Sequence, residues 1–213
     1  MIISLFTTYA QQFNQLADAV IEKDTIKIDQ LLQSGVDINT QHQTSGTTVL
    51  MIASSYYYYD NEVEFLIRKG AKLDLQDNDG KTALIWASSN SFPNAKILVT
   101  NGANVNLAAN DGMTPFLQAT LGVSSGKVTI EICDLLRKKG ANINASLTKK
   151  SAMSWTALHY AVINGDVELV KYLIKYGANV NKATGEGSTP LYLAEIGNQD
   201  EIIKILKNAG AKN

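Results

Sequence analysis

A short phrase that begins with glycine recurs along the chain and constrains its fold more than any other feature. It reads GVDIN, GAKLD, GANVN, GANIN, GANVN and GAKN, starting at Gly35, Gly70, Gly102, Gly140, Gly177 and Gly210. Successive glycines are 35, 32, 38, 37 and 33 residues apart, from the differences between these positions. A repeat of this length predicts a solenoid, in which each unit stacks only on its neighbours.

A second phrase leads every unit after the first. It reads GTTVLMIA, GKTALIWA, GMTPFLQA, SWTALHYA and GSTPLYLA. The threonine in each copy is suited to cap a helix, because its hydroxyl can accept a hydrogen bond from a free backbone amide. Pro115 and Pro190 follow at the first helical position, which proline tolerates. The glycine phrase then suits the end of a second helix, where a left-handed backbone is common.

These phrases resemble the ankyrin repeat, and the unit from Ser154 to Asn181 is close to the family consensus throughout. The resemblance covers about residues 9–213. It implies an all-α, ankyrin-type solenoid of about six helix-turn-helix repeats with hairpin-like loops, forming one domain over residues 1–213. The units are expected at 1–40, 41–75, 76–107, 108–149, 150–182 and 183–213, and are numbered one to six below. The first and last are expected to be caps, and the curved array to bind other proteins.

Three units depart from the pattern. Unit one lacks the threonine phrase, but an apolar stripe predicts a long first helix through Phe6, Tyr9, Phe13, Leu16 and Val20. Unit three is one residue short, and Pro93 is expected in its turn. Unit four carries five extra residues, which predict a stretched turn at LGVSSGKVT, and a longer loop follows at 140–154. The second helix of unit six is expected to face water with its lysines, as a capping unit requires.

Composition argues against several classes of function. The formal net charge is −1, whereas nucleic-acid binders usually show a basic excess, so no nucleic-acid partner is expected. No apolar run approaches the ~20 residues that span a bilayer, so no membrane insertion is expected. The start, MIISLF, lacks the basic region of a secretory signal. We expect a cytoplasmic monomer, and the sequence leaves open that a secretory signal has been trimmed away.

Candidate catalytic groups are few. His159 occupies the histidine place of the ankyrin phrase, so we expect it to bond the neighbouring loop backbone rather than to act as a base. His42 lies in a loop, and Cys133, the only cysteine, is expected to be a buried apolar residue rather than a reactive thiol. Two histidines and one cysteine offer no zinc spacing. The sequence therefore predicts no catalysis, no cofactor and no metal.

Surface recognition remains, and the resemblance places it on the loop tips and the exposed face of the first helices, which form the concave side. The candidate residues for partner binding are Trp155, Met153, Ile163, Met113, Leu121 and Tyr56. Trp155 is the expected anchor, because aromatic residues dominate interface energetics. The alternative is that the loop NASLTKKSAM folds over Trp155 and buries it. The other tryptophan, Trp86, is expected to be buried because it adjoins Ala87.

Four consecutive tyrosines, Tyr56 to Tyr59, raise a separate question. Repeat register places them across a helix end and the following turn, with Tyr56 near the concave face and Asp60 or Asn61 capping the next helix. We expect one or two rings to pack on neighbouring repeats while their hydroxyls reach water. The alternative is that the run extends the partner-binding surface.

The function predicted from these observations is a protein–protein interaction module that binds an unidentified protein through its concave face. Two alternatives stay open. One is a regulatory or inhibitory subunit of an enzyme, and the other is a scaffold that binds a small molecule or a metal.

Overall fold

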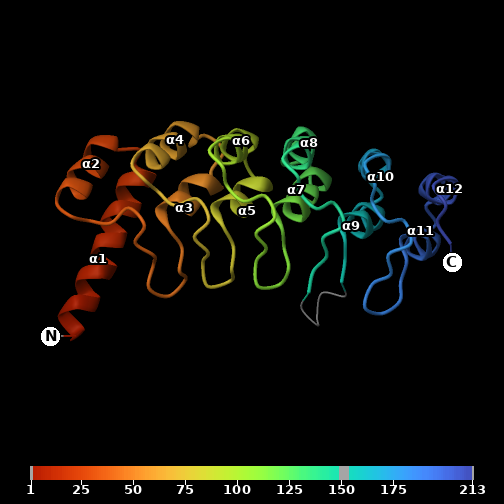
Figure 1. The fold of residues 1–213 in the computed structure, drawn as a ribbon, viewed down its shortest axis with the longest axis horizontal. Coiled ribbons are helices and arrows are strands. Elements are labelled where there is room, and N and C mark those ends of the chain that lie inside the picture. The colour runs from red at the N-terminus through yellow and green to blue at the C-terminus, as the bar shows by residue number, and fades with distance from the viewer. Residues whose placement is uncertain (1, 149–153, 213) are drawn as a thin grey trace.

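The described part of the chain contains twelve helices arranged as six pairs (Figure 1). The structure is a computed structural model that describes residues 2–148 and 154–212, with side chains from residue 10 onward. The helices are α1 (Ile2–Ile21), α2 (Thr25–Gln33), α3 (Val49–Ser55), α4 (Asp60–Arg68), α5 (Ala83–Ser88), α6 (Phe92–Thr100), α7 (Pro115–Ser124), α8 (Glu131–Lys138), α9 (Ala157–Ile163), α10 (Val167–Lys175), α11 (Pro190–Ile196) and α12 (Asp200–Asn208). Within the described ranges there is no β-strand, only one isolated bridge between Ser146 and Thr156. The predicted all-α solenoid is confirmed.

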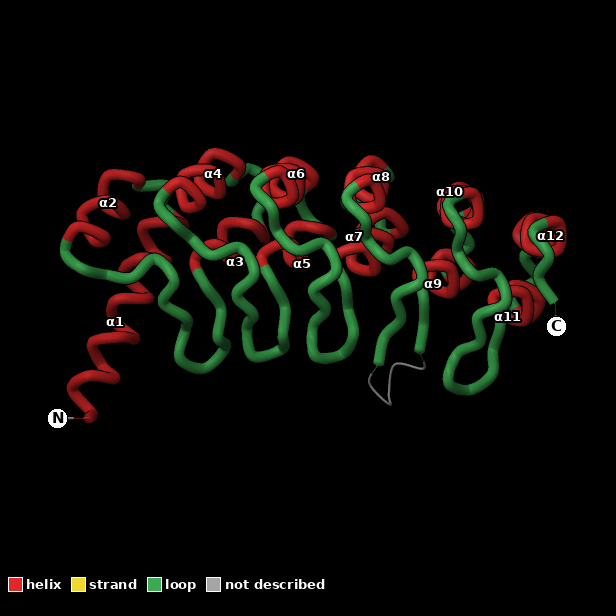
Figure 2. The backbone as a smooth tube through the Cα atoms, in the orientation of Figure 1, coloured by secondary structure: helices red, strands yellow, loops and turns green. Residues whose placement is uncertain are grey.

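The pairs stack into two rows (Figure 2). Even-numbered helices form the outer row, odd-numbered helices from α3 form the inner row, and the long loops project from the inner row on one side. Each inner helix packs on the next, α3 on α5, α5 on α7, α7 on α9 and α9 on α11. Close stacking requires small residues where inner helices meet, and the five alanines of the second phrase are fully buried: Ala53, Ala87, Ala119, Ala161 and Ala194.

Helix starts follow the predicted threonine caps. The hydroxyls of Thr48, Thr82, Thr114 and Thr189 each accept a hydrogen bond from an amide three residues on, in α3, α5, α7 and α11. Two predictions at second helices are wrong. Tyr59 rather than Asp60 or Asn61 stands at the cap of α4, and no side chain bonds there. Pro93 lies in the first turn of α6, capped by Ser91, because a proline without an amide hydrogen fits the start of a helix.

Asparagine side chains tie consecutive units together at the ends of the glycine phrases. Asn106 is typical, since its amide donates to the Gly140 carbonyl at 2.9 Å and its oxygen accepts from the Asn142 amide at 2.9 Å. Asn39, Asn144 and Asn181 make the same paired contacts with the following unit. Between units two and three the equivalent residue is Asp74, which only accepts a bond from the Asn104 amide.

A second set of amide contacts lies nearer the loop tips of units two to four. Gln41 donates to the Gln76 carbonyl at 2.8 Å, and Gln76 donates to the Ala108 carbonyl at 3.0 Å. Asn78 donates to the Thr44 carbonyl and Asn110 to the Asn78 carbonyl, both at 2.9 Å. These bonds satisfy loop carbonyls that have no partner within their own unit.

The two ends of the array are built differently. At the first, α1 is 20 residues long, and Leu16 and Val20 of the predicted stripe are fully buried. Phe6 and Tyr9 lie outside the part whose side chains are described. At the other end, Glu195 and Lys207 form an ion pair of 3.1 Å. At the Glu195 position the internal units carry buried residues such as Ser88, so a charged side chain there marks the last unit of the array.

Unit four accommodates its extra residues in two places. Its first helix, α7, has 10 residues, against 7 in α3 and 6 in α5, and the turn before α8 spans 125–130. The prediction of a stretched turn therefore accounts for only part of the extension, because the helix itself is longer. The turn carries Lys127 toward the inner row.

Candidate partner-binding surface

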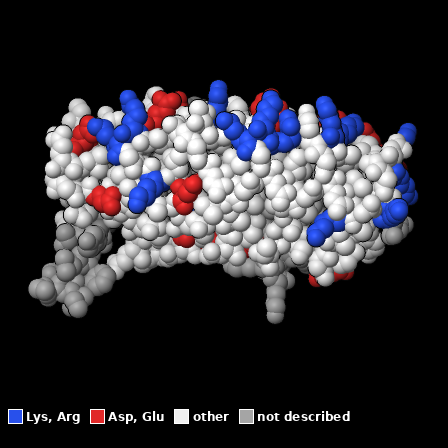
Figure 3. Space-filling model, viewed as in Figure 1, with Lys and Arg blue, Asp and Glu red and all other residues white. Residues whose placement is uncertain are grey.

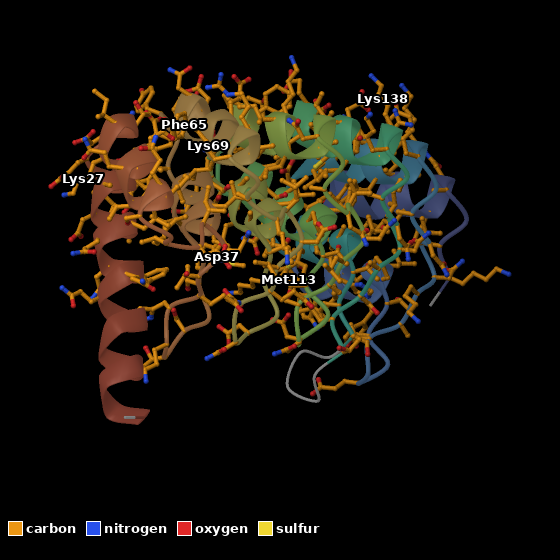
Figure 4. The ribbon with its side chains drawn as sticks, turned by 60° about the vertical axis from the view of Figure 1, so that its left-hand side comes forward. Lys27, Asp37, Phe65, Lys69, Met113 and Lys138 are labelled. Atoms are coloured by element: carbon orange, nitrogen blue, oxygen red, sulfur yellow. The ribbon has the colours of Figure 1, made fainter. Side chains whose placement is uncertain are left out.

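Charged side chains are distributed unevenly over the molecule. On the face shown in Figure 3, most lysine, arginine, aspartate and glutamate side chains gather over the even-numbered helices. Much of the surface beside the inner helices and loops is uncharged. Figure 4 shows the same division, with Lys69 and Lys138 on the outer row and Met113 near the base of the loops. On the face in view, the inner side therefore carries fewer charged side chains than the outer row.

One register position faces this inner side in successive units. It lies four residues after the capping threonine and is occupied by Ile52, Trp86, Gln118 and Tyr160. All four side chains are partly exposed, although the alanine that follows each one is fully buried. Neighbouring residues on a helix point about 100° apart, so one side chain lines the surface while the next enters the stack. The concave face of the array thus runs through Trp86.

The prediction that Trp86 is buried is wrong for this reason. Its indole packs against the core but stays partly exposed, and Nε1 donates to Asp77 Oδ2 at 3.3 Å. Lys81 Nζ lies 5.1 Å from the ring centroid, in a cation–π contact. The Asp77 carboxylate also accepts hydrogen bonds from the amides of Asp79 and Lys81, at 3.0 and 2.8 Å. The contacts with Asp77 and Lys81 therefore fix the orientation of the Trp86 indole.

Trp86 separates two pockets on the concave face. One, of about 210 Å³, lies between α3 and α5 and is mainly apolar; its lining is Thr47, Met51, Ile52, Ser55, Tyr56 and Trp86. The other, of about 190 Å³, lies between α5 and α7 and is polar and basic; its lining is Lys81, Ile85, Trp86, Ser89, Asn90, Gln118 and Lys127. We call these the apolar pocket and the basic pocket. The two pockets, with Trp86 between them, are together called the groove of units two to four.

A second apolar group surrounds the predicted anchor Trp155. Its ring centroid lies 5.2 Å from that of Tyr160 and 6.0 Å from that of His159, and the side chain is half-buried. Its backbone carbonyl accepts a hydrogen bond from the Leu147 amide at 3.1 Å. Ile163 lies on α9 together with His159 and Tyr160 and is 47% exposed. Met153 lies outside the described residues.

Two other sequence candidates sit deeper than expected. Leu121 is partly buried and packs against the core. Met113 is only 9% exposed and belongs to the core, which corrects its placement on the surface. The following loop packs tightly on this segment, because a Cβ added at Gly112 would lie 2.7 Å from the Thr148 amide nitrogen. The described part of the loop after Gly140 therefore packs beside Met113.

The tyrosine run divides between surface and packing. Tyr56 is 48% exposed and lines the apolar pocket, near the concave face as predicted. Tyr57 and Tyr58 are exposed in the turn, with their rings edge to face at 4.8 Å. Tyr59 packs on unit one, where its hydroxyl donates to the Ile21 carbonyl at 2.9 Å and Lys23 lies over its ring. The packing interpretation holds for Tyr59, but its hydroxyl bonds protein rather than water.

His159 has structural contacts. It is fully buried, and its Nδ1 accepts a hydrogen bond from the Thr156 amide at 3.1 Å. Burial lowers the pKa of His159, and the nearby backbone of Ser188 and Lys182 opposes this effect only in part. Cys133 is also fully buried, and burial raises the pKa of its thiol to about 12, so the thiol stays protonated. Both residues stabilise the stack in their neutral forms.

Metal-binding clusters and membrane-spanning helices are both absent from the described residues. In residues 2–148 and 154–212, no three His, Cys, Asp or Glu side chains come together in a group that could hold a metal ion. None of the helices in this part of the chain combines the length and the apolar character needed to cross a membrane.

Comparison with known proteins agrees with this architecture. The family model for ankyrin repeats in three copies matches residues 16–109, 59–147 and 121–213. Rabankyrin-5 of Mus musculus is 32% identical over 202 residues, covering 85% of this chain and 16% of that protein. Putative ankyrin repeat protein FPV031 of Fowlpox virus is 31% identical over 179 residues, covering 80% of this chain and 50% of its own length.

A shorter match is closer in sequence. Notch-regulated ankyrin repeat-containing protein A of Danio rerio is 45% identical over 51 residues, covering 24% of this chain and 46% of that protein. The chain thus spans half or less of the length of these three relatives. Ankyrin repeats are generally protein-interaction modules and typically non-catalytic. The repeats, the twelve paired helices and the matched family model together show that the chain belongs to the ankyrin-repeat family.

Proposed function

We propose that this chain binds a partner protein through its concave face, with the groove around Trp86 as the centre of contact. The observation that carries the proposal is a partly exposed tryptophan, held in place by Asp77 and Lys81 and flanked by two pockets. Tryptophan is enriched among residues whose truncation costs most at interfaces. A side chain that is already fixed loses little conformational entropy on binding.

The group around Trp155 extends the proposed contact surface. Tyr160 occupies the same register position as Trp86, and Ile163 lies one turn further along the same helix. Trp155, Tyr160 and Ile163 together expose apolar surface on unit five, next to the groove of units two to four. A cluster of exposed apolar side chains is more informative than an isolated one. Of the sequence candidates, Trp155, Ile163, Tyr56 and Leu121 stay in the proposed surface and Met113 leaves it.

Site-specific photocrosslinking tests the proposal. A benzophenone amino acid replaces Gln118, which lines the basic pocket beside Trp86, in one variant and Tyr58, which is 76% exposed in the turn between α3 and α4, in a matched control. Both variants are irradiated in lysate of the source organism, and the adducts are identified by mass spectrometry. We expect a defined protein adduct at position 118 that the position-58 variant does not form. Equal adducts at both positions, or none at 118, would exclude the concave groove as the contact.

A further inference from the structure

The two pockets beside Trp86 differ in chemistry, and this difference specifies the partner. We infer that the groove recognises an extended peptide segment in which an aliphatic or aromatic residue stands two or three positions from an acidic residue. The inference rests on the proposed function and names the chemistry of the partner. The apolar side chain enters the apolar pocket, and the carboxylate enters the basic pocket.

The apolar pocket suits a hydrocarbon side chain. Ile52, Met51 and the rings of Tyr56 and Trp86 supply most of its wall, and only the hydroxyls of Thr47, Ser55 and Tyr56 and the Trp86 N–H are polar side-chain groups. The Trp86 N–H is already bonded to Asp77, so the exposed part of the indole offers carbon surface to this pocket. Transfer of an aliphatic or aromatic side chain from water into such a site is favourable by about 25 cal/mol per Å² of apolar surface removed from water.

The basic pocket suits a carboxylate. Lys81 and Lys127 both line it, and its lining contains no acidic side chain. None of the ion pairs within the described residues involves either lysine. The nearest acid on the same loop, Asp77, already accepts three hydrogen bonds, from Asp79, Lys81 and Trp86. Gln118, whose amide donates to the Ser89 hydroxyl at 2.9 Å, gives the pocket a polar floor.

The spacing of the two pockets sets the spacing of the peptide residues. The apolar pocket lies between α3 and α5 and the basic pocket between α5 and α7, so they are one helix apart along the array. Packed helices are about 8–10 Å apart, and an extended chain advances about 3.3 Å per residue. About three residues therefore cover the distance, and two suffice when the acidic side chain is long. The extension of unit four matters here, because its turn supplies Lys127.

Selection from a library tests this directly. Random 12-residue peptides displayed on phage are selected on the full chain, and the enriched sequences are synthesised with a fluorescent label. We expect enrichment of an apolar residue two or three positions from Asp or Glu. Fluorescence anisotropy then measures binding to the Lys81→Glu/Lys127→Glu double variant, which should raise Kd by about tenfold or more, because two favourable charge contacts become repulsive. Failure to enrich any acidic pattern would overturn the inference.

A matched control removes nonspecific charge effects. The double variant Lys96→Glu/Lys204→Glu changes the net charge equally, but both lysines are exposed on the outer helices α6 and α12. It should bind the same peptide within about twofold of the wild type, since distant surface charges are screened. A peptide with lysine in place of its acidic residue should regain binding to Lys81→Glu/Lys127→Glu. Equal weakening by both double variants would contradict a carboxylate site.

Other outcomes separate this inference from the proposed function. If Trp86→Ala abolishes peptide binding but the Lys81→Glu/Lys127→Glu variant does not weaken it, the concave groove stands and the acidic specificity is wrong. If neither change matters, the selected peptides bind elsewhere and both ideas fail. A labelled 12-nucleotide oligothymidine that binds through the two lysines more tightly than the peptides would assign the basic pocket to nucleic acid instead. Each result is read against the melting temperature of the same variant.

Discussion

The surroundings of Trp86 and those of Trp155 show two uses of one concave face. Trp86 is tied to a loop carboxylate, carries Lys81 over its ring and lines two pockets, so part of its indole stays available. Trp155 contacts the rings of Tyr160 and His159 in its own unit, and its backbone pairs with Leu147 across the loop. The first arrangement prepares a side chain for contact with another molecule, whereas the second also stabilises the unit that carries it.

The difference teaches that register, and not residue type, decides what a tryptophan does in a solenoid. Trp86 lies four residues after its capping threonine, inside α5, whereas Trp155 lies one residue before its threonine, at the end of a loop. A position inside the helix has a fixed direction. A position at the loop end depends on how that loop is packed. Four tests of this contrast follow, from the largest expected effect on stability to the smallest.

Both regions rest on the same column of buried alanines, so Ala87→Arg and Ala161→Arg should be equally severe. Each alanine is fully buried between stacked helices, and a long charged side chain has no room there. We expect a loss of more than about 4 kcal/mol in the free energy of unfolding, enough to unfold the array. Thermal unfolding followed by far-UV circular dichroism measures this. An unchanged melting temperature in either variant would mean that the repeat frame is misplaced there.

Trp155→Ala should destabilise the chain more than Trp86→Ala. Trp155 loses contacts with two aromatic rings, and we expect a cost of about 2 kcal/mol. Trp86 loses one long hydrogen bond, one exposed cation–π contact and part of its packing against the core, and we expect about 1.5 kcal/mol. Urea unfolding gives both values. The reverse order would place Trp86 in the core and remove the contrast between the two regions.

The Trp155 region should also be sensitive to pH through His159. Burial lowers the pKa of this histidine, so below about pH 6.5 the unfolded chain binds more protons than the folded chain. The stabilisation is complete above about pH 6.5 and is lost as the pH falls toward the folded pKa. We expect the stability difference between wild type and His159→Gln to shrink over this window. A difference that is constant with pH would contradict this.

Asp134 titrates in a separate and lower range. Hydrogen bonds from Lys138, Arg137 and Tyr172 lower the pKa of this carboxyl to about 2, so it stabilises the fold above the usual aspartate pKa of about 4 and loses this effect only below it. Asp134 is present in both the wild type and the His159→Gln variant. Its contribution to the free energy of unfolding therefore cancels in the difference between them. The two pH windows therefore distinguish the buried histidine from the outer-row carboxylate.

Lys81→Ala should have the smallest effect on stability. Its ammonium group lies over the Trp86 ring at the surface, where a cation–π contact contributes about 0.5 kcal/mol. We expect the free energy of unfolding to change by no more than this amount in urea unfolding. A cost above about 1 kcal/mol would mean that Lys81 holds the loop together and is not a free group of the basic pocket.

The repeat architecture could be predicted from the sequence because the same chemistry occurs in every unit. A threonine that caps, an alanine that stacks and a glycine that ends the second helix each have one structural role, and five copies fix their register. The buried Cys133 and His159 follow from the same alignment, since the equivalent residues of the other internal units are apolar and buried. The longer α7 was not predictable, because extra residues can lengthen either a helix or a turn.

The concave surface was harder to predict. Trp86 was assigned to the core from its neighbour Ala87, although Gln118 at the equivalent position already indicates contact with water. That comparison between units was the available signal. Met113 could not be placed from its own position, because the loop residues packed on its neighbour Gly112, Ser146 and Thr148, lie far along the chain. Burial that depends on residues so distant in sequence is not encoded in local spacing.

Asp74, where the other joints carry asparagine, has a mechanical consequence. A carboxylate has no hydrogen to donate to the Gly102 carbonyl, so units two and three have one tether fewer near their helices. Other side-chain tethers between these units remain, through Gln41 and Asn78 in the loops and through the buried Asn94, whose amide donates to the Tyr56 carbonyl at 2.7 Å just after α3. The missing bond therefore loosens only the ends of the two glycine phrases. A joint held both at the loops and at the helices but not between them can give locally while α3 and α5 stay stacked.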